Sequence, residues 1–468
     1  MGTRRSGERP DTAAAVDDPT RIRNVALVGP SGAGKTTLAE ALLAVTGAIG
    51  RAGSVADGTT ACDHDPAAVR QQRSVTLAVA PLQQVGVKVN LVDTPGYADF
   101  VGELRAGLRA VDAALFVMSA AEDVAPATIA LWEECAVVGM PRAVVVSRLD
   151  HPRADLDGAI AACRDAFGAG VLPLYLPVRD GTAAVTGLVG LLTEQLVDYT
   201  GGYPPQRREP TGVDSDVLTA ARNELIEGII AESEDESLME RYLDGEQLDV
   251  GTLIDDLETA VARGAFHPVI PACAGTGVGL AELLEVLTGA FPAPGERPPP
   301  PVSRPDGTAH PPVVVDPQAP LAGEVVRTLV DPYQGRVALV RVFSGTLRPD
   351  RAVHVSGHGL ADRGHADHDV QERIGHVYTP LGGTLHEVPQ CVAGDLCAVT
   401  KVSSAETGDT LSAVDDPVLM VPWSMPEPLL PVAVVGRSRS DEDALVRNLV
   451  QHRISPSGDH AALRSLAS

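Results

Sequence analysis

Residues 29–36 of the chain are Gly-Pro-Ser-Gly-Ala-Gly-Lys-Thr, which matches the pattern G-x-x-x-x-G-K-[ST] in full. The apolar stretch Asn24–Val28 predicts a buried strand before it, and Thr36–Thr46 predicts a helix after it, ended by Gly47. Glycines in such a turn let backbone N–H groups surround an anion at the helix N-terminus. A purely structural turn is the alternative, but the complete motif in its expected context favours a phosphate site.

The lysine of this motif is one of three in the chain, with Lys88 and Lys401, because arginine is used elsewhere. A compact ammonium group retained at this position indicates that its point charge matters there. Lys35 is predicted to reach the β- and γ-phosphates of a nucleotide, and the Thr36 hydroxyl to ligate Mg²⁺. The predicted nucleotide contacts in this loop are Gly29, Ser31, Gly32, Ala33, Gly34, Lys35, Thr36 and Thr37.

A second motif, Asp93-Thr94-Pro95-Gly96, follows the apolar strand Val87–Val92. An acid at such a strand end can hold Mg²⁺ through water, and the Gly96 N–H can meet a γ-phosphate. The motif is weak alone, but it lies one strand–helix–strand unit after the glycine-rich loop. The two motifs together predict a triphosphate site with a metal ion.

Apolar runs alternate with helical segments through the first 290 residues, which favours βαβ units and a largely parallel sheet. Residues from about 155 to 265 interrupt this alternation and predict an insertion before the last strand. Further strands are predicted at Ala113–Val117, Ala143–Val146, Val171–Val178 and Val269–Ile270, and helices at Phe100–Ala110, Ala125–Val138, Asp214–Ala231, Leu253–Ala262 and Leu280–Leu287.

The composition divides the chain into five parts. Residues 1–20 are polar and predict a disordered arm, and residues 21–290 form the α/β domain. Residues 291–320 are rich in proline, which favours extended backbone and predicts a linker. Residues 321–425 show short alternating strands with Gly and Asp turns, as in a small β-barrel. Residues 426–468 predict a short α+β segment and an unstructured tail.

The net charge of −25 opposes non-specific binding to a phosphate backbone, so free DNA is not an expected partner. Six cysteines without a C-x-x-C pair predict neither a disulfide framework nor a zinc site, and indicate the cytoplasm. The sequence contains no stretch of about 18 apolar residues, so no membrane span is predicted. A monomer is expected.

At this point the sequence resembles the translational GTPases. Residues Asp93–Phe100 resemble that family's D-T-P-G-H-x-D-F, and Gln72–Leu77 resemble its switch I stretch R-G-I-T-I. Within the insertion, Leu225–Glu227 and Glu240–Glu246, followed by His267–Pro271, are similar to elongation factor G. Later segments similar to its β-barrel domain are Asp331–Gly335, Arg341–Leu347, Ala393–Leu396 and Thr407–Leu411.

The resemblance covers roughly residues 22–435. It implies a P-loop GTP-binding domain (G domain) with an inserted subdomain, then β-barrel domain II, and a truncated remnant of domain III. It also implies GTP or GDP with Mg²⁺ as cofactors and the ribosome as partner. The implied metal ligands are Thr36, Thr76 and Asp93, and the implied catalytic residues are Tyr97, Thr76 and Lys35.

Three substitutions depart from the family pattern. Tyr97 replaces the histidine that orients the attacking water, so slower hydrolysis with retained affinity is expected. Residues Ser147-Arg148-Leu149-Asp150 replace N-K-x-D: Asp150 can read guanine and Arg148 can lie over the base. Ser147 is expected to be too short to tie neighbouring loops together, as the family's asparagine does. Cys273-Ala274 replaces the final S-A segment.

The chain is expected to lack translocation activity by itself, because the resemblance ends near Arg453. Three hypotheses follow from the sequence. The first is a truncated elongation factor G-like GTPase. The second is a nucleotide-binding module without hydrolysis that occupies a ribosomal or other partner site, and the third is a degraded gene product.

Six of the twelve histidines lie in the predicted barrel segment. His365 and His368 are three residues apart, with Asp362, Asp367 and Asp369 close by. A divalent metal site and a solvated polar hairpin both fit this composition. The hairpin is favoured, because the spacing matches no tight ligand pattern.

Overall fold

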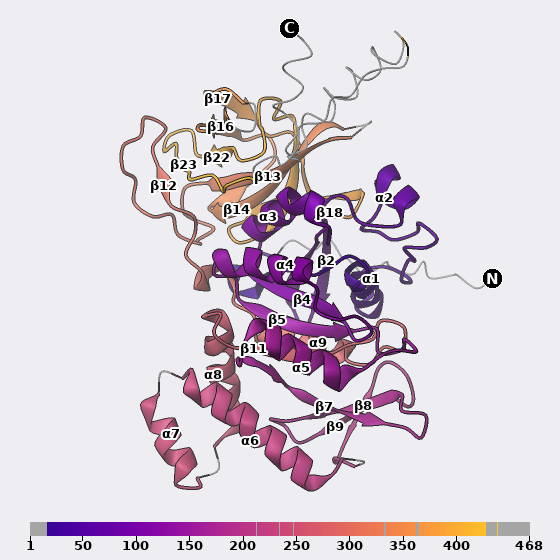
Figure 1. The fold of residues 1–468 in the computed structure, drawn as a ribbon. Coiled ribbons are helices and arrows are strands. Elements are labelled where there is room, and N and C mark those ends of the chain that lie inside the picture. Colours follow the sequence, from indigo (N-terminus) through magenta and orange to yellow (C-terminus); the bar gives the residue numbers. More distant parts are fainter. Residues whose placement is uncertain are drawn as a thin grey trace, which may run out of the picture.

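The computed structural model describes residues 16–426, apart from 212, 234, 247, 332–333 and 362–364, together with residue 438. Figure 1 shows an α/β region followed along the chain by a β-rich region that lies against it. The predicted remnant and tail at 426–468 lie almost entirely outside the described residues, as do residues 1–15 of the predicted arm. The end of that arm is structured, because Asp18 caps the short helix η1 (Pro19–Arg21).

Within the described residues, seven strands form the main sheet in the order β2-β3-β1-β4-β5-β11-β6. Every neighbouring pair is parallel except β2 and β3. The strands are buried along almost their whole length, as expected when helices cover both faces of a sheet. Their bounds are β1 Ile22–Val28, β2 Ala78–Gln84, β3 Val87–Asp93, β4 Ala113–Ser119, β5 Arg142–Ser147, β6 Val171–Pro173 and β11 His267–Pro271.

One apolar core lies on each face of this sheet. Helices α1 and α9 contribute to the first core, and α3, α4 and α5 contribute to the second. This arrangement confirms the predicted α/β class. The helices are α1 Lys35–Val45, α2 Pro66–Gln71, α3 Val101–Ala110, α4 Pro126–Val137, α5 Leu156–Phe167 and α9 Leu280–Gly289. Every helix in the described residues is too short or too polar to cross a lipid bilayer.

The observed insertion begins later than the predicted position of about 155. Helix α5 packs on the main sheet, and β6 extends that sheet by pairing in parallel with β11. The predicted strand Val171–Val178 is therefore divided between β6 and the first inserted strand. The additional elements are β7 Tyr175–Arg179, β8 Val185–Gly190, β9 Leu196–Asp198, β10 Gln206–Arg208, α6 Ser215–Ala231, α7 Glu236–Leu243 and α8 Val250–Ala262.

The predicted proline-rich linker is not simply extended chain. Phe291 and Pro294 are buried, and a short strand β12 (Val302–Ser303) pairs with β23 (Leu419–Met420). A turn of 3-10 helix, η3 (Pro294–Glu296), precedes it. The segment therefore packs along the junction of the two regions, because its apolar residues find buried surface there.

The β-rich region contains, among its described residues, eight antiparallel strands in the order β17-β16-β22-β13-β14-β21-β18-β19. All eight of these strands and the short β15–β20 pair supply side chains or flanking residues to one apolar core, so the sheet curves around that core as a barrel does. The bounds are β13 Ala322–Asp331, β14 Gly335–Ser344, β15 Thr346–Leu347, β16 Ala352–Gly357, β17 His368–Arg373, β18 Val377–Leu381, β19 Thr384–Glu387, β20 Cys391–Val392, β21 Leu396–Thr400 and β22 Thr410–Ser412.

A buried polar network joins the two regions. The Lys88 ammonium donates to both carboxylate oxygens of Asp395, at 2.7 and 2.9 Å. The Arg341 guanidinium donates to both carboxylate oxygens of Asp112, at 2.9 and 3.0 Å. All four side chains are almost fully buried. Asn24 and Asn90 connect the two ion pairs through amide hydrogen bonds. This network fixes how the two regions are aligned against each other.

Candidate functional site

A cavity of about 180 Å³ lies where the glycine-rich loop meets α1. The loop, the segment between α1 and β2, and the residues after β3 and β5 all contribute to its wall. Parallel strands bring their carboxyl ends to one edge of the sheet, which is why these segments converge. The cavity is lined by Ser31, Gly32, Gly34, Lys35, Thr36, Thr37, Val55, Asp63, Gln72, Arg73, Ser74, Gly96 and Arg148.

The loop and the residues after β3 approach each other closely. The Ser31 amide donates to the Gly96 carbonyl oxygen at 3.2 Å. A Cβ added at Gly96 would lie 2.5 Å from the Gly29 oxygen and 2.6 Å from the Lys35 ammonium nitrogen. No side chain can replace this glycine without displacing the loop. The two predicted motifs therefore form one wall of a shared cavity.

Lys35 is buried at the start of α1. Its ammonium group donates to the carbonyl oxygens of Gly29 at 2.7 Å and Pro30 at 3.1 Å. Burial lowers the pKa of Lys35 to about 8. Among the described residues no ion pair joins this ammonium to a carboxylate. A cation held in a cavity wall by neutral oxygens alone is suited to an anionic ligand.

Asp93, Thr36 and Ser74 meet beside the lysine. The Thr36 hydroxyl donates to Asp93 Oδ2 at 2.6 Å and lies 3.2 Å from the Ser74 hydroxyl. Burial raises the pKa of Asp93 to about 7, and burial also raises the pKa of Asp63. One oxygen of each carboxylate is buried with no hydrogen-bond partner. This donor set of hydroxyl and carboxylate oxygens fits Mg²⁺, which prefers such ligands.

Tyr97 lies at the rim and is 40% exposed. The Arg73 guanidinium carbon lies 4.6 Å from the centre of its ring. The pKa of the Tyr97 phenol is lowered by a polar contact with the Ser31 side chain, which is the largest single cause, and by Arg73.

Ser147 contradicts the expectation that it is too short to tie neighbouring loops. Its hydroxyl lies 2.5 Å from the Ala33 carbonyl oxygen of the glycine-rich loop and 2.9 Å from the Met118 carbonyl oxygen at the end of β4. The end of β5 approaches both segments closely enough that a short side chain suffices.

The predicted base-reading residues come together at the same edge. A Cβ added at Gly275 would lie 2.6 Å from Asp150 Oδ2, so Asp150 adjoins the loop that holds Cys273 and Ala274. Cys273 is buried and its amide donates to the Val278 carbonyl oxygen at 2.8 Å, so it shapes this loop. The exposed Arg148 pairs with Glu122 at 3.7 Å.

Thr76 does not line the cavity, whereas Ser74 does. The metal contact predicted for Thr76 stays a prediction. Sequence reasoning did not select Asp63, Ser74 or Arg73 as site residues. Arg73 and Ser74 lie inside the switch I stretch already recognised, which could have indicated them. Asp63 lies in a loop where no local pattern marks it.

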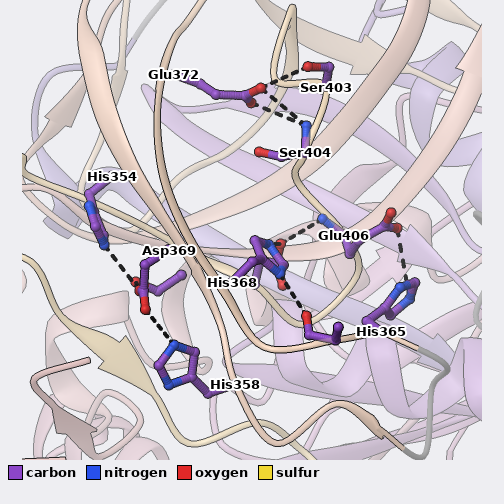
Figure 2. A network of polar contacts seen from close by, with 12 residues as sticks. His354, His358, His365, His368, Asp369, Glu372, Ser403, Ser404 and Glu406 are labelled. Atoms are coloured by element: carbon purple, nitrogen blue, oxygen red, sulfur yellow. Dashed lines mark hydrogen bonds and ion pairs between the residues drawn. The ribbon is translucent and has the colours of Figure 1, made fainter. Parts of the chain in front are cut away.

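The histidine-rich part of the barrel forms separate pairs with carboxylates. Figure 2 shows His354 and His358 on either side of Asp369, and His365 directed toward Glu406. His368 lies 2.9 Å from the buried Asp409, and this hydrogen bond raises its pKa to about 9. Across the described part of the chain, no group of three or more such side chains is arranged to hold a metal ion.

A largely parallel sheet covered by helices, a glycine-rich loop opening α1 and a base-side loop define a P-loop nucleotide-binding protein. A family model for the elongation factor Tu GTP binding domain matches residues 20–293, and one for elongation factor G domain 2 matches residues 320–414. The chain belongs to the translational GTPases and is elongation factor G-like.

The relatives carry the same description. Elongation factor G-like proteins of two Mycobacterium tuberculosis strains, CDC 1551 and H37Rv, are 57% identical over 92% of this chain and 60% of theirs. One from Thermotoga maritima is 30% identical over 92% of this chain and 59% of its own. A crystal structure from Thermus thermophilus matches 94% of this chain and 61% of that chain, with a TM-score of 0.79 and 34% identity. The chain thus spans about 60% of the length of the curated relatives it matches.

Proposed function

We propose that this chain binds GTP and GDP with Mg²⁺ in the cavity around Lys35 and acts as a GTPase at the ribosome. The observation that carries the proposal is the buried Lys35 ammonium, held by two carbonyl oxygens beside a helix N-terminus. Phosphate oxygens of a bound nucleotide would act as the counter-ion of this ammonium. Mg²⁺ would be held by Thr36, with Asp93 nearby, and would neutralise phosphate charge when bound.

Guanine is the base we propose, because Asp150 lies beside the loop of Cys273, Ala274 and Gly275. A carboxylate there can accept from guanine N1–H and N2–H₂, which adenine does not offer. Ser147 would hold the base-side loop to the phosphate loop. The ribosomal partner and the cytoplasmic location stay predictions.

A specific observation also favours the alternative, a guanine-nucleotide-binding module without hydrolysis. The phenol of Tyr97 faces Ser31 and Arg73, so it is engaged with protein groups where the family has a water-orienting histidine. An engaged neutral phenol is a poor substitute for that group. Binding would then persist while cleavage is slow.

Two measurements test these proposals. Titrations with fluorescent GDP and ADP in magnesium buffer should show binding of the guanine nucleotide alone. Single-turnover GTP cleavage with and without ribosomes then separates the GTPase from the non-hydrolysing module. Tyr97→His should raise cleavage if only the water-orienting group is lost. Indifference to guanine nucleotides would refute both versions.

A further inference from the structure

The turn between β18 and β19 reaches from the β-rich region to the segment between α1 and β2, which supplies Asp63 to the cavity wall. It consists of Gly382 and Gly383, and its flanking residue Leu381 packs against the first apolar core of the main sheet. The Gly382 amide donates to the Val79 carbonyl oxygen of the edge strand β2 at 2.8 Å. Figure 1 shows β18 beside β2, far from β18 in the sequence.

This turn contacts residues 61–64, in the segment between α1 and β2. A Cβ added at Gly382, whose φ is +53°, would lie 1.8 Å from the Ala61 carbonyl oxygen. A Cβ added at Gly383 would lie 2.8 Å from the His64 ring. Two backbones at this separation leave no space for a side chain, so the contact is tight.

The same segment is fastened to the phosphate-binding helix on its other side. Glu40 of α1 is buried and accepts hydrogen bonds from the Ala61 amide at 2.6 Å and the Gly53 amide at 2.8 Å. Asp63 lies between the contact with Glu40 and the contact with the Gly382-Gly383 turn, and it lines the cavity together with Val55. The neighbouring Cys62 is buried in the first apolar core of the main sheet.

We propose that the Gly382-Gly383 turn is a positioning element for the nucleotide site: it holds residues 61–64, which include Asp63, in place beside the cavity. This inference rests on the proposed function, because it concerns the nucleotide bound there. The β-rich region then controls how readily the α1–β2 segment opens. A displacement of that region would reach residues 61–64 through the contacts of Gly382 and Gly383.

The test is the dissociation rate of a fluorescent GDP from the full chain in magnesium buffer, chased with excess GDP. In Gly382→Ala the new methyl group displaces residues 61–64, and we expect dissociation to accelerate at least about fivefold, the lower end of usual couplings between sites. Gly359→Ala is the matched control. Its φ is also positive, at +70°, but nothing lies within 4 Å of an added Cβ. Its dissociation rate should equal that of the parent.

A second pair of variants keeps the test decisive if Gly382→Ala does not fold. Gly383→Ala meets the His64 side chain, so dissociation should again accelerate, and adding His64→Ala should restore the parent rate. Equal rates in the parent and the folded turn variants, with only a lower melting temperature, would overturn the proposal and leave the proposed function intact. If the parent itself binds no guanine nucleotide, the proposed function fails and this inference fails with it.

Discussion

Two buried lysines of this chain have opposite surroundings. Lys88 is 3% exposed and its ammonium meets both oxygens of Asp395. Lys35 is 6% exposed, and within the described part of the chain its ammonium donates to the carbonyl oxygens of Gly29 and Pro30 without forming an ion pair with a carboxylate. The first lysine has its counter-ion in the fold, whereas the second has no ion-paired carboxylate among the described residues, which is the basis of the anion site proposed above.

The surrounding polar groups follow the same division. Around Lys88 the carboxylate of Asp395 also accepts from the Asn90 amide and from its own neighbour's backbone. Around Lys35 one oxygen each of Asp93 and Asp63 is buried without a partner. Both oxygens of Asp395 are thus satisfied within the fold, although Asn90 Oδ1 and Arg341 Nε of the same network are buried without a partner. The contrast between the two sites therefore lies in the carboxylates beside each lysine, not in the polar network as a whole.

The largest effect is expected for Lys88→Met. This change leaves the Asp395 carboxylate buried without its counter-ion, which should lower the free energy of unfolding by about 3–5 kcal/mol. Urea denaturation measures it, with the exposed Lys401→Met as the control. A Lys88→Met protein as stable as the control would show that the ion pair is not a structural element.

Lys35→Met should act on binding instead of on folding. Loss of the ammonium should weaken GDP binding by about 2–5 kcal/mol, since a buried charge partner of the phosphates is removed. The ligand-free protein should be equally or more stable, because a buried cation without a carboxylate is lost. Fluorescent-GDP titration and urea denaturation measure the two effects. A clear loss of stability would contradict the contrast between the two lysines.

The pH dependence of the ligand-free protein should reveal the same unsatisfied site. Folded Asp93 keeps its proton up to a pH of about 7, whereas its ordinary pKa is 3.8, so stability should fall as the pH rises between these values. Folded Lys35 loses its proton near pH 8 rather than 10.5, so its contribution should rise with pH across that range. Denaturation of the parent and of Asp93→Asn at several pH values isolates the first effect. A parent and variant with identical pH profiles would contradict it.

The smallest effect is expected for Ser147→Ala. Loss of the hydroxyl bonded to the Ala33 and Met118 carbonyl oxygens should cost about 1 kcal/mol of stability, with a comparable loss of GDP affinity. The exposed Ser215→Ala at the start of α6 is the control. Unchanged affinity would mean that the loops keep their positions without this bridge.

Much of the fold could be predicted because its signals are local. The glycine-rich loop and the apolar runs of β1, β3, β4 and β5 each contain their own pattern, so their positions were recognised. Strand β2 was not predicted; it contains Pro81, which an edge strand tolerates. The residues of α5 and β6 were assigned to the insertion because the alternation of strands and helices is interrupted from about residue 155, and the pairing of β6 with β11 leaves no local signal.

The site shows the same limit. Lys35, Thr36 and Gly96 were predicted and line the cavity, because their motifs are contiguous in sequence. Asp63 was missed because its loop owes its position to Glu40 on one side and Gly382 on the other. The bridging role of Ser147 depends on the distance between β5 and the loop, which no residue pattern encodes.

The sequence by itself determined the phosphate-binding turn, the α/β class and the family, because backbone geometry and apolar periodicity act over a few residues. Only the tertiary structure decided which lysine has a counter-ion, what Ser147 connects and where the β18–β19 turn lies. Lys88 and Asp395 are 307 positions apart. Contacts at such separation depend on how whole elements pack, and packing is a property of the assembled chain.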